Sequence, residues 1–382
     1  MKSINTFRGC LLGGAVGDAL GYAVEFLTEK SIKEIFGSNG ITEYRLQNDK
    51  AIISDDTQMT LFTATGILYG VTRFRTRGIW GGPIPYIYHS YLAWLYTQDE
   101  DKKPKGLINS WLVNIPEINR RRAPGNTCIS ALSRGEMGTI QKPLNDSKGC
   151  GGIMRVAPIG LYYEPRNEEK QTEVDLLGAE VAAITHGHDL GYIPAAALTH
   201  IINKIIYADY KLLEAIESSI SSMKKLFKES QYLQDFLNLM YKAIELSQEE
   251  NNDLEAIKQL GQGWVAEETL AIAIYCALKY ENNFEKAIIA SVNHGGDSDS
   301  TGAVTGNILG ALLGVEAIPE KFLKDLELKE EIIEIADDLF NDCQISEYGP
   351  ERDEVWENKY IYMSYPNKPD FEKLFGGDKW HN

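Results

Sequence analysis

Two short acidic clusters have the residue types and the spacing for metal chemistry. One spans Ser54 to Thr57 with the sequence SDDT, and the other spans Gly295 to Ser300 with the sequence GGDSDS. Each directly precedes an apolar run that we expect to be helical, so each falls in a first helical turn. A helix start needs only one Ser or Asp as its cap. Because two carboxylates crowd each start, divalent-metal binding and capping both remain open from the spacing alone.

The oxygen ligands decide which metals would suit these clusters. Mg²⁺ and Mn²⁺ bind carboxylate and hydroxyl oxygens. If the two clusters met in the folded chain, four carboxylates would repel one another, and some would hold protons unless cations were bound. Two divalent ions would roughly balance the four carboxylate charges. The clusters lie far apart in the sequence, so their meeting is a hypothesis at this point.

A further pair of carboxylates lies near the start of the chain. Asp18 sits in a glycine-rich segment from Gly9 to Gly21, and Glu25 follows seven residues later. Seven residues are two turns of an α-helix, so the two side chains could share one face. A buried carboxylate that faces a site is a candidate general acid or base. A surface charge at a helix end is the alternative interpretation.

Three loops could contact a ligand. One carries Asn126 and Thr127, the second is a glycine loop from Ser147 to Gly152, and the third carries His186 and His188. Glycine loops can bind phosphate through backbone N–H groups. This loop matches neither the P-loop nor the dinucleotide-binding pattern. The two histidines have no evident third nitrogen or sulfur ligand, so we expect them to form hydrogen bonds rather than to bind zinc.

Two glycine-rich helices are expected to position these residues. Glycines recur at every fourth position from Gly9 to Gly21 and again from Gly302 to Gly314. On a helix this spacing gives a nearly straight ridge. Each glycine inside a helix costs about 1 kcal/mol relative to alanine. Close approach of another helix would compensate this cost, so we expect both helices to be central and buried.

The rest of the chain indicates an all-α fold. Helical apolar spacing occurs in seven further segments, which are Asp175–Ile184, Ala195–Ile206, Leu212–Phe227, Leu233–Leu246, Glu267–Tyr280, Phe284–Val292 and Leu326–Phe340. Only Ile41–Leu46 and Gly160–Tyr163 suggest extended structure. Because no repeat and no low-complexity linker is visible, we expect one compact domain over residues 1–344 and a tail of unclear role over residues 345–382.

Composition argues against several classes of partner. The 382 residues carry a formal net charge of −17, with 38 basic and 55 acidic side chains, which argues against nucleic-acid binding. The five cysteines are widely spaced and form no CxxC pair, so neither a disulfide framework nor a zinc site is expected. We expect a cytoplasmic protein without a signal peptide. No membrane partner is expected, because the uncharged stretch from Ser300 to Val315 is short and rich in glycine and polar residues.

Taken together, these motifs resemble the ADP-ribosylglycohydrolase family, which includes the dinitrogenase reductase-activating glycohydrolases. The motifs follow one another in the family's order over most of the chain. They are GCLLGGAVGDALGYAVEF from Gly9, SDDTQM from Ser54, GNTC from Gly125, KGCGGIMRVAPIGL from Lys148, THGH from Thr185, GWVAEETLAIAIYCAL from Gly263 and NHGGDSDSTGAVTGNILGALLG from Asn293.

The resemblance implies an all-α fold that holds two Mg²⁺ or Mn²⁺ ions, and it assigns roles to individual residues. The metal ligands would be Ser54, Asp55, Asp56, Asp297, Asp299 and Ser300. Glu25 matches a glutamate that lies over the metals and is a catalytic or gating acid in some members. The substrate-binding residues would be Asn126, Thr127, Ser147, Lys148, Gly149, Cys150, Gly151 and His186. The family usually has threonine at the position of Ser54, and serine keeps the hydroxyl ligand.

One departure from the family pattern bears on the acceptor. Nitrogenase-regulating members have a further aspartate, assigned as the base, on a helix before a tryptophan. The comparable stretch here, Tyr86 to Trp94, contains no acid. This difference weakens an arginine-specific assignment and shifts weight to Glu25.

The resemblance implies hydrolysis of the glycosidic bond between ADP-ribose and an acceptor. The acceptor could be arginine, another side chain of an ADP-ribosylated protein, or a small molecule. Two other interpretations remain open. One is an ADP-ribose-binding or toxin-neutralising module without turnover, and the other is a binuclear phosphohydrolase that would release phosphate.

Overall fold

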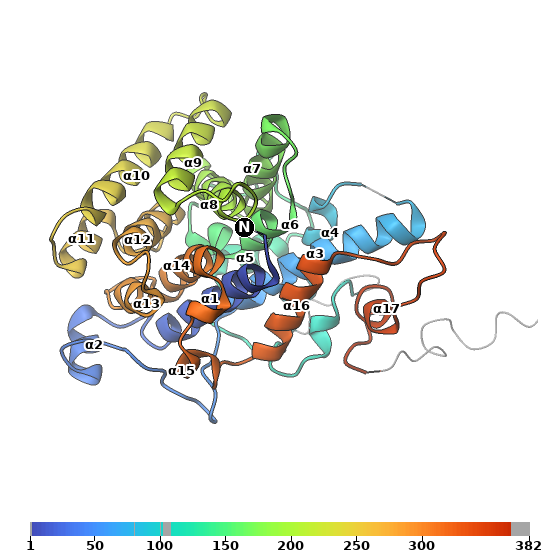
Figure 1. The fold of residues 1–382 in the computed structure, drawn as a ribbon, viewed down its shortest axis with the longest axis horizontal. Helices are drawn as coiled ribbons and strands as arrows, with labels where there is room; N and C mark the ends of the chain where they lie inside the picture. The colour runs from blue at the N-terminus through green and yellow to red at the C-terminus, as the bar shows by residue number, and fades with distance from the viewer. Residues whose placement is uncertain (1, 80, 100, 102–107, 368–382) are drawn as a thin grey trace, which may run out of the picture. The chain divides into compact units, whose positions relative to one another are not determined.

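The computed structural model describes residues 2–79, 81–99, 101 and 108–367. Within these residues the regular structure is helical, and the β-type pairings are isolated bridges such as Gly149 with Val265. Figure 1 shows the helices in chain order. The predicted all-α fold is confirmed. No helix among the described residues is both long and apolar enough to cross a lipid bilayer.

The chain divides into two compact units, residues 1–61 with 122–340 and residues 62–121 with 341–382. The first unit contains α1 (Ile4–Tyr22), α2 (Glu29–Phe36), α5 (Asn126–Leu132), α6 (Ala157–Tyr162), α7 (Glu168–Ala183), α8 (Asp189–Ala208), α9 (Leu212–Leu226), α10 (Leu233–Ser247), α11 (Asp253–Leu260), α12 (Ala266–Lys279), α13 (Phe284–Val292), α14 (Ser298–Leu313), α15 (Glu320–Leu323) and α16 (Lys329–Asn341). The helix α3 (Asp55–Arg77) begins in this unit and continues into the second, which also contains α4 (Ile84–Gln98) and α17 (Glu354–Tyr360). The boundary after residue 344 stays a prediction.

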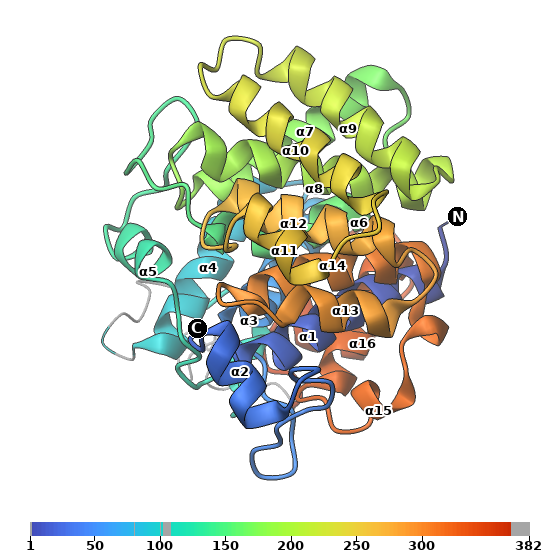
Figure 2. The ribbon, with the colours of Figure 1, turned by 90° about the vertical axis from the view of Figure 1, so that its left-hand side faces the viewer.

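The two glycine-rich helices, α1 and α14, pack directly on each other at the centre of the first unit. Figures 1 and 2 both show them side by side. A Cβ atom added at Gly9, Gly13 or Gly17 would lie closer than 3.0 Å to the backbone carbonyl of Gly310, Gly306 or Gly302, respectively. The helices are therefore antiparallel, and their backbones touch where side chains would otherwise keep them apart. Gly314, the last glycine of the second ridge, follows the end of α14 with a φ of 78°.

The substitution Gly13→Ala should destabilise the first unit although alanine is the better helix former. Its methyl group would clash with the carbonyl of Gly306. Overpacking of this kind costs about 1–3 kcal/mol, which exceeds the gain of about 1 kcal/mol in helix propensity. Urea unfolding of both variants measures the difference, with Gly81→Ala as the control because a methyl group there meets nothing within 4 Å. Equal stability of the two variants would contradict the close packing.

The remaining helices of the first unit build outward from this pair. α12 packs against α14 on one side and α10 on the other, and α8 packs against both α7 and α9. Figure 2 shows α9 and α10 on the far side of α12 from α1. Six of the seven further segments predicted as helices coincide with α7, α8, α9, α10, α12 and α13 or with parts of them. None of these six segments runs more than one residue past the end of its helix.

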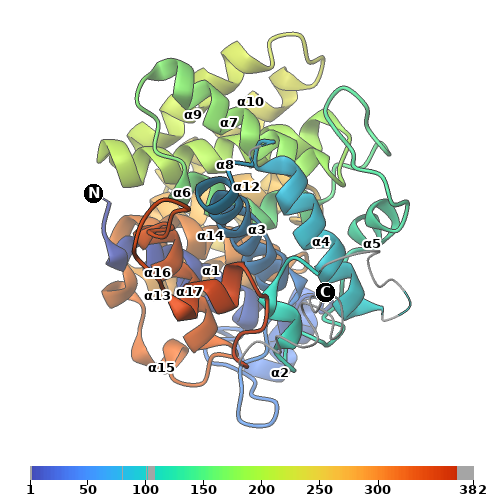
Figure 3. The ribbon, with the colours of Figure 1, turned by 90° about the vertical axis from the view of Figure 1, so that its right-hand side faces the viewer.

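The second unit is organised around α3 and α4, which lie side by side in Figure 3. An added Cβ on Gly66 of α3 would lie 2.8 Å from the Cα atom of Ile87 on α4. The hydroxyls of Thr63 and Tyr91 form a hydrogen bond of 2.6 Å between the same helices. The region after residue 344, whose role the sequence left unclear, contributes α17.

Two segment predictions were wrong. Gly160 to Tyr162 ends helix α6 instead of being extended, because a short run buried on all sides gives no period to separate strand from helix. The helix predicted from Leu326 begins at Lys329 as α16, because Leu328 has a left-handed φ of 58°. Ile41–Leu46, which was expected to be extended, lies outside the helices, and the backbone of Ile41 pairs with the side chain of Asn293.

Candidate active site

The buried carboxylate of Asp18 joins α1 to the start of α3. It accepts the backbone N–H of Ser54 at 3.0 Å and that of Thr57 at 3.1 Å, and it also accepts the hydroxyl of Thr57. The first N–H groups of a helix have no partner within the helix, so a carboxylate there stabilises the helix start. Asp18 therefore positions the first acidic cluster. From the sequence, Asp18 was a candidate general acid or base, and no sequence pattern indicated its contact with the start of α3.

The two acidic clusters meet in the fold. The hydroxyl of Ser300 donates a hydrogen bond of 2.8 Å to the carboxylate of Asp56, although 244 residues separate them. Asp297 caps α14 by accepting the N–H of Ser300 at 3.3 Å. All six residues that the sequence assigned to metal binding are buried, namely Ser54, Asp55, Asp56, Asp297, Asp299 and Ser300.

A buried ion pair supports the start of α3 from the other side. The backbone N–H of Asp55 donates to the carbonyl of Arg122 at 3.0 Å. The guanidinium of Arg122 in turn binds the carboxylate of Glu327 at 2.7 Å. Neither residue belongs to a sequence motif, and because their meeting depends on the fold, the sequence carries no signal for this pair. The N–H of Gly125 also donates to the Asp55 carboxylate, at 3.3 Å.

Burial and mutual repulsion make these carboxylates hard to ionise. Desolvation, followed by the charge of Asp299, raises the pKa values of Asp55, Asp56 and Asp297 well above the usual range. The same causes, in the same order, raise the pKa of Asp18 to about 7 and that of Glu25 to about 10. Several neighbouring carboxyl groups therefore hold protons at neutral pH unless a cation replaces those protons.

The carboxylate and hydroxyl oxygens of the two acidic clusters are suitable ligands for a hard divalent cation. Their side chains are not arranged as a complete coordination shell. Among the described residues, no three His, Cys, Asp or Glu side chains are grouped so that they could hold a metal ion. The carboxylates of Asp56 and Asp297 instead accept hydrogen bonds from Ser300 and Cys150, each at 2.8 Å. The buried Oε2 atom of Glu25 has no hydrogen-bond partner. An unpartnered acceptor beside crowded aspartates is an arrangement that a cation would stabilise.

Glu25 lies in a turn just after α1 and lines a cavity of about 440 Å³. Its side chain is largely buried, and the exposed rings of Phe26 and Trp264 stack nearby with centroids 6.1 Å apart. Both aromatic residues line the same cavity. Glu25 is therefore placed between the acidic clusters, whose charges act on it, and a space that a ligand can enter.

The predicted substrate loops lie together on the first unit. The hydroxyls of Thr127 and Ser147 form a hydrogen bond of 3.1 Å, which joins the segment after Gly125 to the glycine loop. The thiol of Cys150 connects the glycine loop to the second acidic cluster through Asp297. Lys148, which the sequence assigned to substrate binding, forms an ion pair with the carboxylate of Glu267. Its contact with substrate stays a prediction.

His186 faces the glycine loop. The guanidinium of Arg155 donates to the hydroxyl oxygen of Thr185 at 2.7 Å, and the same hydroxyl is hydrogen-bonded to Nδ1 of His186 at 2.8 Å. Burial and the charge of Arg155 lower the pKa of His186 to about 3, so the ring is neutral. The Nε2 atom of the ring faces Gly149 and Gly151. Added Cβ atoms at Gly149 and Gly151 would approach this ring atom, at 3.4 and 3.3 Å.

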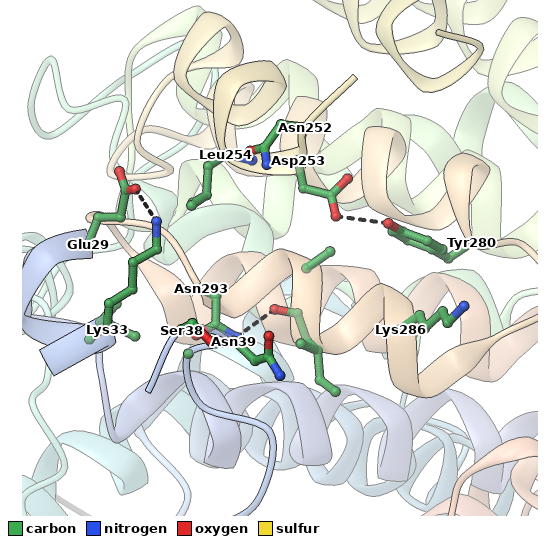
Figure 4. A pocket seen from close by; sticks show the side chains of 14 residues that line it. Glu29, Lys33, Ser38, Asn39, Asn252, Asp253, Leu254, Tyr280, Lys286 and Asn293 are labelled. Atoms are coloured by element: carbon green, nitrogen blue, oxygen red, sulfur yellow. Dashed lines mark hydrogen bonds and ion pairs between the residues drawn. The ribbon is translucent and has the colours of Figure 1, made fainter. Parts of the chain in front are cut away.

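A different cavity, of about 430 Å³, lies between the segment after α2 and the helices α11 and α13 (Figure 4). It contains none of the residues that the sequence assigned to the site. Several of its charged and polar side chains pair with one another, as Glu29 does with Lys33 at 2.7 Å and Asp253 does with Tyr280 at 2.8 Å. This cavity therefore offers no unpaired buried group that would select a ligand.

Comparison with known proteins identifies the family and the fold of this all-α chain. A family model described as ADP-ribosylglycohydrolase matches residues 2–348. The chain therefore belongs to the ADP-ribosylglycohydrolase family of enzymes. An uncharacterized protein of Archaeoglobus fulgidus is 30% identical over 87% of this chain and 95% of its own length. The ADP-ribosyl-[dinitrogen reductase] glycohydrolase of Rhodospirillum rubrum is 25% identical, with 85% and 90% covered.

A solved structure, titled ADP-ribosylglycohydrolase-related protein complex, has the same fold. Its TM-score is 0.61, at 24% identity, and the likeness covers 88% of this chain and 98% of that one. At this level of identity the likeness establishes the fold. The family resemblance inferred from the sequence motifs is confirmed by the family model, whereas the roles of individual residues stay predictions.

Proposed function

We propose that this protein hydrolyses the glycosidic bond between C1 of the distal ribose of an ADP-ribosyl group and its acceptor, and that two Mg²⁺ or Mn²⁺ ions are required. The ions would be held by the two acidic clusters, through Ser54, Asp55, Asp56, Asp297, Asp299 and Ser300. The observation that carries the proposal is the burial of both clusters against each other, joined by the hydrogen bond from Ser300 to Asp56, beside a cavity lined by Glu25.

Each part of the site has a task in such a reaction. When bound, the ions would supply the charge that orients the ribose hydroxyls and a water molecule. Positive charge develops on the ribose as the acceptor departs, and the acidic surroundings favour that charge. Glu25 would take a proton from the attacking water. The backbone N–H groups of the glycine loop and the ring of His186 would form hydrogen bonds with the diphosphate.

Product analysis tests this proposal against the two other interpretations. The protein would be incubated with ADP-ribosyl-arginine, ADP-ribosyl-serine and O-acetyl-ADP-ribose, with Mg²⁺, with Mn²⁺ or with EDTA, and the products separated by chromatography. Release of ADP-ribose that requires the ions supports the proposal. Release of phosphate would identify a phosphohydrolase, and tight binding of ADP-ribose without any product would identify a binding module.

The acceptor is the least constrained part of the proposal. The relative from Rhodospirillum rubrum is named for an ADP-ribosylated protein, dinitrogen reductase. Here the stretch from Tyr86 to Trp94 lies on α4 and offers no carboxylate for a second base. We therefore infer that Glu25 is the base. The preferred acceptor is the one whose substrate releases ADP-ribose fastest among the three substrates above.

Metal binding should strengthen as the pH rises. The raised pKa values mean that the metal-free carboxyl groups hold protons at neutral pH, and these protons must leave when oxygen atoms bind a cation. Affinity should rise by up to about tenfold per pH unit for each proton released. Titration calorimetry with Mn²⁺ at several pH values measures both the two expected ions per chain and this slope. A pH-independent affinity, or no binding at all, would contradict the proposed ligand set.

A further inference from the structure

Three side chains on neighbouring helices form a hydrogen-bonded chain outside the acidic site. Nδ1 of His200 on α8 lies 2.7 Å from the Asp175 carboxylate on α7, and Nε2 of His200 lies 2.9 Å from the hydroxyl of Ser218 on α9. Both distances are within hydrogen-bond reach. A hydroxyl, an imidazole and a carboxylate in this order are the parts of a nucleophile with its base, and such a site is recognised by geometry rather than by sequence position.

The direction of these hydrogen bonds follows from the donors available. The Asp175 carboxylate also accepts a hydrogen bond from Gln171 at 2.8 Å and one from the hydroxyl of Ser222 at 2.6 Å. An ionised carboxylate only accepts, so Nδ1 of His200 must carry the proton that faces it. With a neutral ring, Nε2 then has a free lone pair that accepts the Ser218 hydroxyl proton. Gln171 and Ser222 fix the carboxylate, which fixes the ring.

The exposure of these three side chains differs in the way that a nucleophile requires. Asp175 is 0% exposed and His200 is 2% exposed, whereas Ser218 is only half buried. Ser218 and His200 line a cavity of about 290 Å³ together with Lys204 and Lys225. A histidine that served only to tie helices together would not need its last partner to border an open space.

The spacing of the lining residues follows the turns of two helices. His200 and Lys204 are four residues apart on α8, and Ser218, Ser222 and Lys225 follow one another at intervals of four and three on α9. Residues at these intervals share one helix face. Lys204, Ser218 and Lys225 therefore line the same small space, to which Glu168 adds an acid and Leu226 an apolar surface.

We propose that Ser218, His200 and Asp175 form a second, metal-independent active site that hydrolyses esters of short carboxylic acids. The Ser218 oxygen attacks the ester carbonyl carbon while His200 Nε2 takes the hydroxyl proton. The carbon–oxygen bond to the alcohol then breaks, and His200 returns the proton to the departing alkoxide. Water, deprotonated by His200 in the same way, releases the acid and regenerates Ser218. Lys225, which lines the same cavity, favours the negative charge on the oxyanion, and Asp175 positions the ring.

Covalent labelling tests the nucleophile in the unaltered protein. A fluorophosphonate forms a bond between phosphorus and the Ser218 oxygen and releases fluoride, and the hydroxyl proton passes to His200. Mass spectrometry should find the adduct on the peptide that contains Ser218, with full labelling retained in EDTA. An adduct on other residues only, or no adduct, would overturn the proposal.

Turnover of 4-nitrophenyl acetate in EDTA provides the second test. Ser218→Ala and His200→Gln should each lower the protein-dependent rate by about 100-fold or more, the usual range for loss of a general base or its nucleophile. The matched control is Ser247→Ala on α10, because the Ser247 hydroxyl donates to the Ile244 carbonyl within its own helix. Circular dichroism checks that each variant is folded. A rate for folded Ser218→Ala equal to that of the unaltered protein would show that the three side chains only tie α7, α8 and α9 together.

Discussion

Asp299→Ala is expected to abolish release of ADP-ribose and to weaken Mg²⁺ or Mn²⁺ binding, while the fold survives. Among nearby charges, that of Asp299 is the largest contributor to the raised pKa values of Asp18, Asp55 and Asp56, as well as to those of Glu25 and Asp297. This carboxylate is therefore at the electrostatic centre of the site. Its removal takes away a proposed ligand, and in the metal-free protein it also relieves repulsion, so a loss of stability is not expected.

Three measurements on the same preparation decide this prediction. Chromatography gives the rate of ADP-ribose release, calorimetry gives the Mn²⁺ affinity, and thermal unfolding in EDTA gives the stability of the fold. Glu245→Ala is the matched control, because Glu245 is an exposed acid on α10 of the same unit. Full activity of Asp299→Ala at an unchanged metal concentration would remove Asp299 from the proposed ligand set.

The sequence predicts the centre of the fold well because glycine spacing has a strong physical meaning. Four glycines in one helix are costly unless another backbone comes close, and the approach of Gly13 to Gly306 supplies that compensation. The all-α class follows from the same kind of periodic evidence. The start of α16 was beyond prediction, because the left-handed Leu328 has no glycine or asparagine to signal it.

The site was predictable in its composition but not in its connections. Two carboxylates at each helix start are visible in the sequence, and the family resemblance identifies them as one site. The role of Asp18 as the cap of α3 depends on where α1 lies, so spacing within α1 could only suggest a face shared with Glu25. Likewise, the ion pair of Arg122 with Glu327 joins residues 205 apart in the chain.

The chain of Asp175, His200 and Ser218 shows why such contacts escape sequence reasoning. The three residues lie on three successive helices at separations of 25 and 18 residues. Asp175 began a predicted helix, and His200 had no decisive pattern. Only the packing of α8 against both α7 and α9 brings the three side chains together.

Glu25→Gln should lower kcat for ADP-ribose release by about 10²- to 10⁴-fold, the usual cost of removing a general base, while the Kd for ADP-ribose changes little. Glutamine keeps the size and the hydrogen bonding of the side chain and removes only its ability to take a proton.

Desolvation and the charge of Asp299 raise the pKa of Glu25 to about 10, so the carboxylate becomes an effective base only when cations offset the neighbouring aspartates. The remaining activity of the variant should still need the ions, because they also orient the ribose and the water. Glu34→Gln, an exposed acid on α2, is the matched control. Normal kcat for Glu25→Gln would assign the base to another carboxylate of the clusters and leave Glu25 as a residue that lines the cavity.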